Sequence, residues 1–270
     1  MWLSPNSYLP KFSVQSSDNF ILEKIYPLIS PQYRLTNDTG HYIELARNFN
    51  AESLKRSPIF ERPLYSLLIR LTSSIFQVFT PSSYGITFVS AILLNFILAA
   101  FTVLLFFKTL GKLFPLRIAY LSSILLIFSP FFHIFLIQAV PSILSAFTAV
   151  VSLYLLQDYI KKSSIKKLIL FSLIIGILLL GKMFFSISFF ILLLALYFKR
   201  YREGIVFSAV HLIPFGLWYL WLTKIWQIPY SSYEVNYYQA ESWVFNIFQW
   251  PWNQTFQIFL RSVPNFFESL

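Results

Sequence analysis

Residues 84–226 consist of long apolar runs separated by short basic clusters, and no other feature of the sequence constrains the fold as strongly. An apolar run of about 20 residues is long enough to cross a membrane as a helix. The runs predict six spanning helices, at Tyr84–Phe107, Phe114–Phe132, Ile134–Leu156, Leu168–Gly181, Phe184–Phe198 and Ile205–Trp226. The fourth and fifth runs are short for a bilayer, so a single re-entrant pair is an alternative for them. The predicted fold class is therefore an all-α, polytopic membrane helix bundle.

The composition excludes most soluble classes of protein. Hydrophobic residues make up 57% of the chain and charged residues only 12%, whereas a soluble domain has roughly 45–50% apolar and 25% charged residues. A cytosolic enzyme, a disordered chain and a coiled coil are all inconsistent with these proportions. The chain has no cysteine, which also excludes disulfides, thiolate metal sites and a cysteine nucleophile.

Basic residues concentrate in three short loops, which follow the first, third and fifth predicted spans. Ten of the 21 basic residues lie there, namely Lys108, Lys112, Arg117, Lys161, Lys162, Lys166, Lys167, Lys199, Arg200 and Arg202. All of the eleven acidic residues except Asp158 and Glu203 fall on the other side. By the positive-inside rule the basic loops are cytoplasmic. The net charge of +10 is therefore a topology signal rather than a sign of nucleic-acid binding, and we expect an integral, multi-pass protein of the cytoplasmic membrane.

This topology divides the chain into three regions. Residues 1–83 form an outer-face region with juxtamembrane helices, residues 84–226 form the transmembrane bundle, and residues 227–270 form an outer-face polar-aromatic segment. No signal peptide or spanning run precedes residue 83. Either the first span carries residues 1–83 across the membrane as a reverse anchor, or a helix belongs before Met1. We favour the second, and we expect the C-terminal segment to be truncated as well.

Two short amphipathic helices are predicted on the outer face, before the first span. The first begins with Asp38 at its N-cap, and its apolar residues recur at helical spacing. One face carries Tyr42, Leu45, Ala46 and Phe49, and the other carries Glu44, Arg47 and Asn48. The second begins at Pro63, a residue suited to the first turn of a helix, and runs to about Phe79. Each helix starts next to an ionisable group, so together they predict the polar floor of a site.

Three motifs occur in order along the chain and carry a resemblance to a known family. They are Asp38…Tyr42…Ala46-Arg47, then Phe60-Glu61-Arg62-Pro63-Leu64, then Gly176-Ile177-Leu178-Leu179-Leu180-Gly181-Lys182. The first resembles the first outer loop of C-type (GT-C) glycosyltransferases, membrane enzymes that take sugars from polyprenyl-phosphate carriers. The likeness is to the branch of protein O-mannosyltransferases and bacterial aminoarabinose transferases of lipid A. There the loop starts with Asp-Glu-x-Arg-Tyr and continues to a Glu-Lys-Pro-like tripeptide, and a Gly-rich helix end closes on a Lys.

The resemblance spans roughly residues 34–200, and the chain departs from the family's pattern within it. Position 39 is Thr instead of Glu, and Arg62 stands where the tripeptide has Lys. Many members carry a second acidic residue at the outer start of the fourth helix. The corresponding stretch here has no acid, and we expect Gln138 or Ser142 to take that place.

The resemblance implies a glycosyltransferase that moves a sugar from a polyprenyl-phosphate-linked donor to a lipid, glycan or protein acceptor outside. The chemistry fits the residue types. A carboxylate can deprotonate the acceptor as general base, which gives Asp38 the catalytic role. Arg62 and Lys182 can stabilise the departing lipid phosphate. Tyr42, His41 and Glu61 complete the candidate substrate-binding residues.

The cofactor and the function class retain alternatives at this point. A divalent metal is compatible with the chemistry, but the sequence shows no clear ligand set, and Glu61 is expected to pair with Arg62 or Arg56. His41 is compatible with a metal ligand, a donor to substrate or neither. The alternative function is a non-catalytic membrane subunit or a transporter-like bundle. The polar groups gather in outer loops rather than near mid-membrane, which favours the enzyme.

Overall fold

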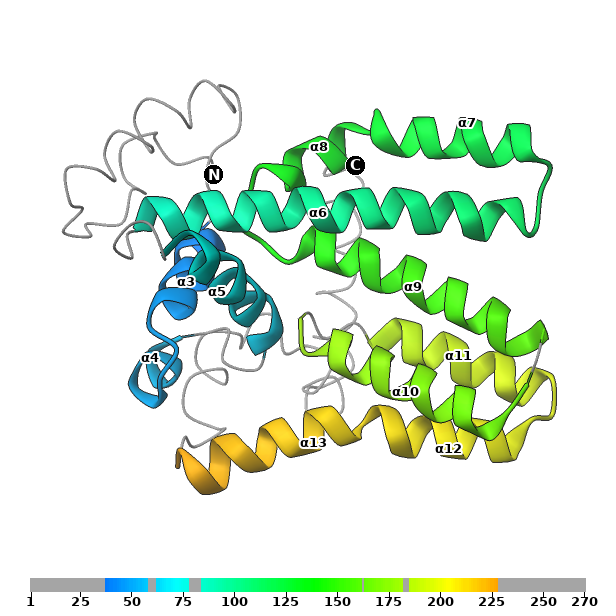
Figure 1. Ribbon diagram of the computed structural model, residues 1–270. Coiled ribbons are helices and arrows are strands. Elements are labelled where there is room, and N and C mark those ends of the chain that lie inside the picture. Colours follow the sequence, from blue (N-terminus) through cyan, green and yellow to red (C-terminus); the bar gives the residue numbers. More distant parts are fainter. Residues whose placement is uncertain (1–36, 58–61, 78–83, 162, 182–184, 228–270) are drawn as a thin grey trace, which may run out of the picture.

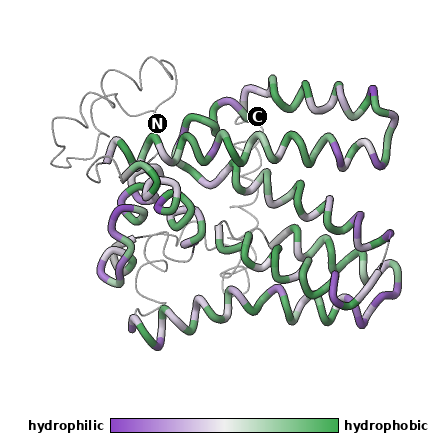
Figure 2. Tube along the Cα trace, in the orientation of Figure 1, coloured by the Kyte–Doolittle hydropathy of each residue, from purple (hydrophilic) through white to green (hydrophobic). Residues whose placement is uncertain are grey.

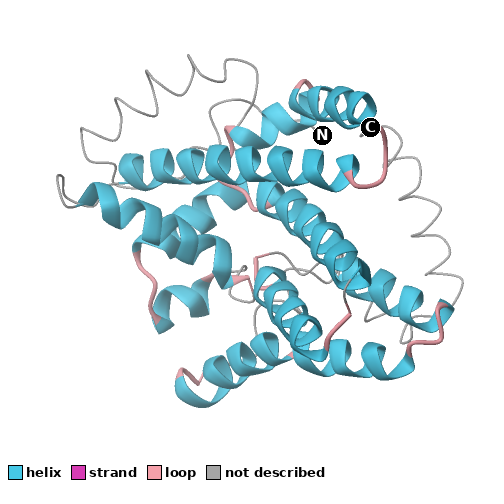
Figure 3. Cartoon of the chain, turned by 45° about the vertical axis from the view of Figure 1, so that its right-hand side comes forward, coloured by secondary structure: helices cyan, strands magenta, loops and turns pink. Residues whose placement is uncertain are grey.

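The computed structural model describes residues 37–57, 62–77, 84–161, 163–181 and 185–227. Over these residues the chain forms helices joined by short turns (Figure 3), which confirms the predicted all-α class. The elements are α3 (Asn37–Arg47), α4 (Ala51–Arg56), α5 (Pro63–Gln77), α6 (Tyr84–Gly111), α7 (Leu116–Ile127), α8 (Pro130–Leu136), α9 (Ser142–Lys161), α10 (Ile165–Leu179), α11 (Phe185–Tyr197), α12 (Tyr201–His211), α13 (Ile213–Leu220) and the π-helix η2 (Trp221–Ile225).

Helix α6 runs along the molecule and organises the first half of the bundle (Figure 1). It packs against α7 and α9 along its length and against α3 and α5 at one end. Helices α10, α11, α12 and α13 form a second group, which α10 joins to the first by packing on α9. The described part of the predicted outer region, α3 to α5, therefore sits directly on the transmembrane bundle.

Two hydrophobic cores hold these groups together. The larger core draws buried residues from α3, α5, α6, α8 and the start of α9, including Tyr42, Tyr65 and Phe88. The smaller core lies between the end of α9 and helices α10, α11 and α12, with Phe171 and Phe207 in contact at 5.5 Å between ring centroids. Side chains of α3 and α5 thus share one core with α6.

Three helical stretches are long and apolar enough to cross a membrane: Tyr84–Gly111, Ser142–Lys161 and Tyr201–Ile225. Helix α7 is apolar but only 12 residues long, and α10 has 15 residues and α11 has 13. Large apolar side chains cover the outside of α7, where Leu125 is 71% exposed. Such a surface suits contact with lipid and not with water. The number of spans, six from the sequence, stays a prediction.

The bounds predicted for the second and third spans were wrong. Helix α7 ends at Ile127, and a separate helix, α8, occupies the segment that joins it to α9. Pro130 begins α8, and Pro141 precedes the first residue of α9. A proline cannot donate a backbone hydrogen bond inside a helix, so these two positions separate three elements where the sequence predicted two.

The three basic loops lie together at one end of the bundle, and α3 to α5 lie at the other (Figures 1 and 2). The loops join α6 to α7, α9 to α10 and α11 to α12. Their hydrophilic residues form a polar rim at the end of otherwise apolar helices (Figure 2). The grouping of these loops on one side, expected from the charge pattern, is thus a property of the fold.

Candidate functional site at the outer end

Helix α3 is amphipathic as the sequence predicted. Tyr42, Leu45 and Ala46 are each 1% exposed, while Glu44 and Arg47 are exposed. Phe49 follows the helix and packs against Trp218 of α13 and against Trp226, at 6.3 and 6.1 Å between ring centroids. These contacts fix α3 between α5 and the end of the second helix group.

The predicted N-cap position of Asp38 was wrong. Helix α3 already includes Asn37, so Asp38 lies within the first turn. A carboxylate in the first turn is still favoured, because the unpaired N–H groups there make the N-terminus of a helix electropositive. The side chain of Asp38 lies outside the described part of the chain.

Tyr42 lies in the core rather than on a surface. Its ring meets the ring of Tyr65 edge-on, with 5.2 Å between centroids. Its backbone carbonyl accepts a hydrogen bond from the Ser66 hydroxyl, 3.2 Å away. Tyr42 therefore joins α3 to α5 through both its ring and its backbone.

A buried hydrogen-bond network joins α5 to α6 and to the segment after α8. The Tyr65 hydroxyl donates to Asn95 Oδ1 at 2.9 Å. The Asn95 amide donates to the backbone carbonyl of Gln138 at 2.7 Å and to that of Phe135 at 3.2 Å. Tyr65 and Asn95 are both 0% exposed. Burial raises the pKa of the Tyr65 hydroxyl well above its usual range, so the hydroxyl stays a donor.

Sequence reasoning did not single out Tyr65 and Asn95. Asn95 is the one amide side chain in the apolar run Tyr84–Gly111. A polar residue in such a run usually faces a partner, so this signal was available. Gln138, proposed to replace the family's second acidic residue, is 5% exposed and supplies a carbonyl to the same network. Ser142, the other candidate, begins α9.

The start of α5 and the end of α10 meet directly. The backbone N–H of Leu64 donates to the carbonyl of Leu180, at 3.3 Å. Leu64 belongs to the second motif and Leu180 to the third, and 116 positions separate them in the sequence. Arg62, which is half-buried, immediately precedes α5. The fold therefore joins these two motifs, which the sequence alone placed only on the same side.

The glycines of the third motif have a packing explanation. A Cβ at Gly176 would lie 2.2 Å from the backbone oxygen of His211, so only glycine allows α10 to approach the junction of α12 and α13. A Cβ at Gly181 would lie 2.3 Å from Cδ2 of Leu144, at the start of α9. The motif thus sets how closely the end of α10 packs on its neighbours.

A polar hollow of about 280 Å³ lies between α3 and α4. His41, Glu44, Leu45, Asn48, Asn50, Glu52, Ser53 and Ser57 line it. Two carboxylates, two amides and an imidazole give the hollow groups that can bind hydroxyls. His41 is the member of this set that the sequence singled out. Among the residues that the structure describes, no three His, Asp or Glu side chains form a group that could hold a metal ion.

Glu61 and Lys182, the remaining sequence candidates, lie outside the described residues. Residues 228–270 of the predicted polar-aromatic segment also lie outside them. The structure thus brings together the α3 helix that carries Asp38 and His41, the α5 helix that follows Arg62, and the end of α10. We predict that Asp38, Arg62 and Lys182 share one cavity.

An all-α membrane bundle with a polar, helix-built end is the architecture expected of a C-type membrane glycosyltransferase. Comparison with known families agrees with this class. Residues 58–226 match the family model of the dolichyl-phosphate-mannose-protein mannosyltransferases. The chain belongs to this family, and it is a membrane glycosyltransferase of the GT-C type. No curated protein and no solved structure shows significant similarity to the chain. The matched residues include the second and third motifs and begin after α3, so the assignment does not depend on Asp38.

Proposed function

We propose that the outer end of this protein transfers a sugar from a polyprenyl-phosphate-linked donor to an acceptor on the non-cytoplasmic face of the cytoplasmic membrane. The family's own name specifies a lipid-phosphate-linked mannose donor and a protein acceptor. The bundle provides an apolar surface along which a polyprenyl chain can lie. The acceptor is a hydroxyl or amine of a lipid, a glycan or a protein.

In the proposed reaction, the acceptor attacks the anomeric carbon of the sugar. A new bond forms between the acceptor and that carbon as the bond to the phosphate oxygen breaks. Asp38 takes the proton of the acceptor, and polyprenyl phosphate leaves with the electron pair. Arg62 binds the phosphate through its planar guanidinium, and Lys182 adds a point charge.

The backbone hydrogen bond from Leu64 to Leu180 is the observation that carries this proposal. Arg62 precedes Leu64 by two residues, and Lys182 follows Leu180 by two. A two-residue stretch reaches at most about 7 Å. Arg62 and Lys182 are therefore each only two residues from the same hydrogen bond, and two cations so placed in the chain are well suited to bind one phosphate.

The other candidate residues receive supporting roles. We assign His41 and the polar hollow beside it to the acceptor, because the hollow presents donors and acceptors suited to hydroxyl groups. Glu61 orients Arg62 as a neighbouring anion. Tyr42, which the sequence placed among substrate-binding residues, supports α5 from the core and so positions Arg62 indirectly.

The membrane orientation follows from the charge pattern. The basic loops lie at the end of the bundle opposite α3 to α5. The positive-inside rule assigns those loops to the cytoplasm, and α3 to α5 therefore to the outer face. A lipid-linked donor presented on that face needs no nucleotide-binding loop.

The test measures donor turnover in membranes that contain the protein and its native acceptors. Polyprenyl-phosphate-mannose with a radiolabelled polyprenyl chain is the probe, and release of labelled polyprenyl phosphate is the readout. Asp38→Asn is expected to lower turnover by roughly 10²–10⁴-fold, the usual contribution of a general base. Arg62→Ala is expected to raise the donor KM, since charge-assisted contacts to the phosphate are lost.

Arg70→Ala is the matched control, because Arg70 is an exposed arginine on α5, the helix that Arg62 precedes. Its turnover should equal that of the unmodified protein. Full turnover in Asp38→Asn would remove Asp38 from the mechanism. An unmodified protein that inserts normally but releases no polyprenyl phosphate would favour the alternative, a non-catalytic subunit or transporter-like protein.

A further inference from the structure

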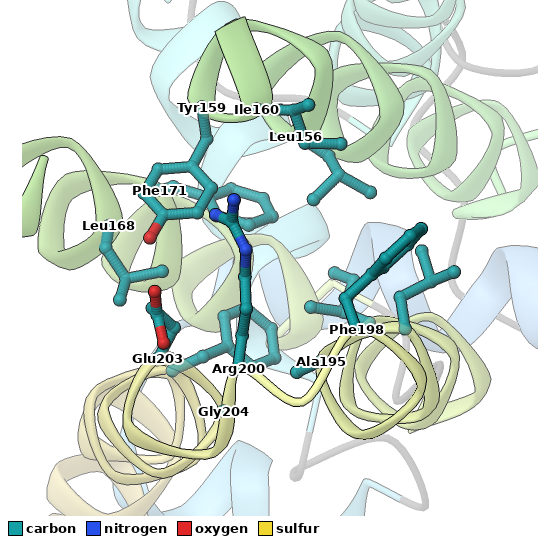
Figure 4. Close-up of a pocket in the computed structure, with 13 residues that line it drawn as sticks. Leu156, Tyr159, Ile160, Leu168, Phe171, Ala195, Phe198, Arg200, Glu203 and Gly204 are labelled. Atoms are coloured by element: carbon teal, nitrogen blue, oxygen red, sulfur yellow. The ribbon is translucent and has the colours of Figure 1, made fainter. Parts of the chain in front are cut away.

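An apolar cavity of about 180 Å³ lies at the end of the bundle opposite α3 to α5 (Figure 4). Side chains from α9, α10, α11 and α12 surround it. Most of its wall is aliphatic or aromatic, with Leu156, Phe171, Ile191, Leu194 and Phe207 among the lining residues. The proposed sugar-transfer chemistry makes no use of this cavity, because the two lie at opposite ends of the helices.

Three residues that line this cavity, Tyr159, Arg200 and Glu203, carry polar groups, and we call them its polar edge. Figure 4 shows the Arg200 side chain extending over the apolar wall toward Tyr159. A second hollow of about 340 Å³ shares Tyr159, Leu168 and Glu203 with the cavity and adds Ser163, Ser164 and Arg202. The apolar cavity thus adjoins a hollow whose lining includes one arginine, one glutamate and two serine hydroxyls.

Cations outnumber anions around this edge. In the described loops after α9 and α11 and the first turns that follow them, the basic residues are Lys161, Lys166, Lys167, Lys199, Arg200 and Arg202. The acidic residues nearby are Asp158 and Glu203, and Asp158 is paired with Lys167 at 2.7 Å. The excess of positive charge at this edge therefore attracts an anion.

The turn between α11 and α12 sets the position of Arg200. The Arg200 N–H donates to the carbonyl of Ala195 at 2.7 Å, and Lys199 has a φ of 55°. This is the arrangement that closes many helices, and its left-handed position is usually glycine. In this turn the left-handed position is Lys199, although glycine adopts that conformation at lower cost. The turn therefore carries a cation immediately before Arg200.

We propose that this edge binds an anionic phospholipid of the leaflet at the basic end of the bundle. One acyl chain enters the apolar cavity, and the phosphate lies against Arg200 and Arg202. An occupant must have an apolar tail and an anionic head joined at the membrane surface, because the apolar cavity and the cationic edge are adjacent. Phospholipids of that leaflet have this form, and basic pockets at helix ends bind such headgroups.

The experiment titrates the purified full-length protein with phosphatidylglycerol or with phosphatidylcholine of the same acyl chains. Bound lipid is counted by native mass spectrometry, and the ratio of the two affinities is the readout. The unmodified protein is expected to prefer phosphatidylglycerol. The double variant Arg200→Ala/Arg202→Ala should lose most of this preference, by roughly fivefold for each arginine.

The matched control is Lys108→Ala/Arg117→Ala, which removes the same charge from exposed positions at the same end, next to the turn between α6 and α7. Its preference should change less than twofold. A loss as large as that of the arginine pair would show general charge attraction and would overturn the proposal. So would an unchanged preference in the arginine double variant.

Three further variants separate the effect of the cavity from the effect of the charges and from misfolding. Ala195→Phe fills the cavity and should weaken binding of both lipids alike. Glu203→Gln removes the carboxylate at the edge and should strengthen the phosphatidylglycerol preference, while Arg200→Gln weakens it. A misfolded protein cannot produce both signs. Glycerol phosphate should not displace the lipid, and displacement at the lipid's own concentration would show a site for free phosphate and refute the lipid assignment.

Discussion

The buried pair of Tyr65 and Asn95 offers a quantitative test of how α5 is held on the bundle. Tyr65→Phe removes one donor and leaves Asn95 Oδ1 without it, which should lower the free energy of unfolding by about 1–1.5 kcal/mol. Asn95→Leu leaves the buried Tyr65 hydroxyl without its acceptor and removes the amide that donates to the carbonyls of Gln138 and Phe135. The Gln138 carbonyl keeps a second donor, the Val140 N–H at 2.8 Å. Since one hydroxyl is left unpaired and two carbonyls each lose a donor, the expected loss is about 2–4 kcal/mol.

The double variant isolates the bond itself. When both partners are replaced, the Tyr65 hydroxyl no longer exists to be left unpaired, so the two losses should not add. We expect a coupling of about 0.6–1.5 kcal/mol, in the range measured for hydrogen bonds between helices in membranes. The assay is a titration with a denaturing detergent in mixed micelles, with helix content as the signal.

A matched control is Tyr120→Phe, since Tyr120 is 60% exposed on α7. Its free energy of unfolding should change by less than about 0.5 kcal/mol. Additive losses in the Tyr65 and Asn95 variants would mean that the hydrogen bond does not stabilise the contact of α5 with α6.

Two other predictions test the packing and the orientation of the bundle. Gly176→Ala should lower the free energy of unfolding by about 1–3 kcal/mol, because its Cβ would meet the backbone of His211. Gly216→Ala is the same chemical change in open space and should leave the stability unchanged or raise it by up to about 1 kcal/mol. Coinciding denaturation curves for the Gly176→Ala and Gly216→Ala variants would contradict this packing argument. The chain has no cysteine, so single cysteines report the topology. Asn48→Cys should react with an impermeant thiol reagent in intact cells and Lys166→Cys only after lysis, and the opposite pattern would reverse the proposed orientation.

Periodicity predicted the local structure well where one helix face is buried. The repeat of Tyr42, Leu45 and Ala46 predicted which side of α3 enters the core, and Pro63 predicted the start of α5. A helix that buries one stripe of apolar residues must show that stripe in its sequence. These elements could therefore be derived without knowing their neighbours.

Helix ends inside apolar segments were harder to predict. The turn before Pro130 lies among phenylalanines, so hydropathy continues through it and only the proline marks the break. At the junction of α12 and α13, Pro214 follows Ile213 and interrupts the helix only at Leu212. The stretch Tyr201–Ile225, close to the predicted span Ile205–Trp226, remains long and apolar enough to cross a membrane. Hydropathy reports the environment of a residue and not the path of the backbone.

The contacts between distant segments could not be predicted from local pattern. Tyr65 and Asn95 lie in different helices, and nothing in either segment identifies its partner. The bond between Leu64 and Leu180 uses backbone atoms, which leave no trace in the sequence. The order of the motifs indicated a common site, and the hydrogen bond between Leu64 and Leu180 shows how two of them meet.

The depth at which α5 and α10 meet has a consequence for how two substrates would approach. Tyr65 bonds to Asn95, which lies about 16 Å along α6 from Tyr84 at 1.5 Å per residue. Helix α10, with 15 residues, is only about 22 Å long, whereas a hydrocarbon core is about 30 Å thick. In the proposed orientation, the start of α5 therefore lies deeper in the membrane than the Tyr84 end of α6. In the proposed reaction, a lipid-linked donor would reach that level by lateral diffusion in the membrane, while a water-soluble acceptor would reach it from the aqueous side. The two can meet without either one having to leave before the other enters.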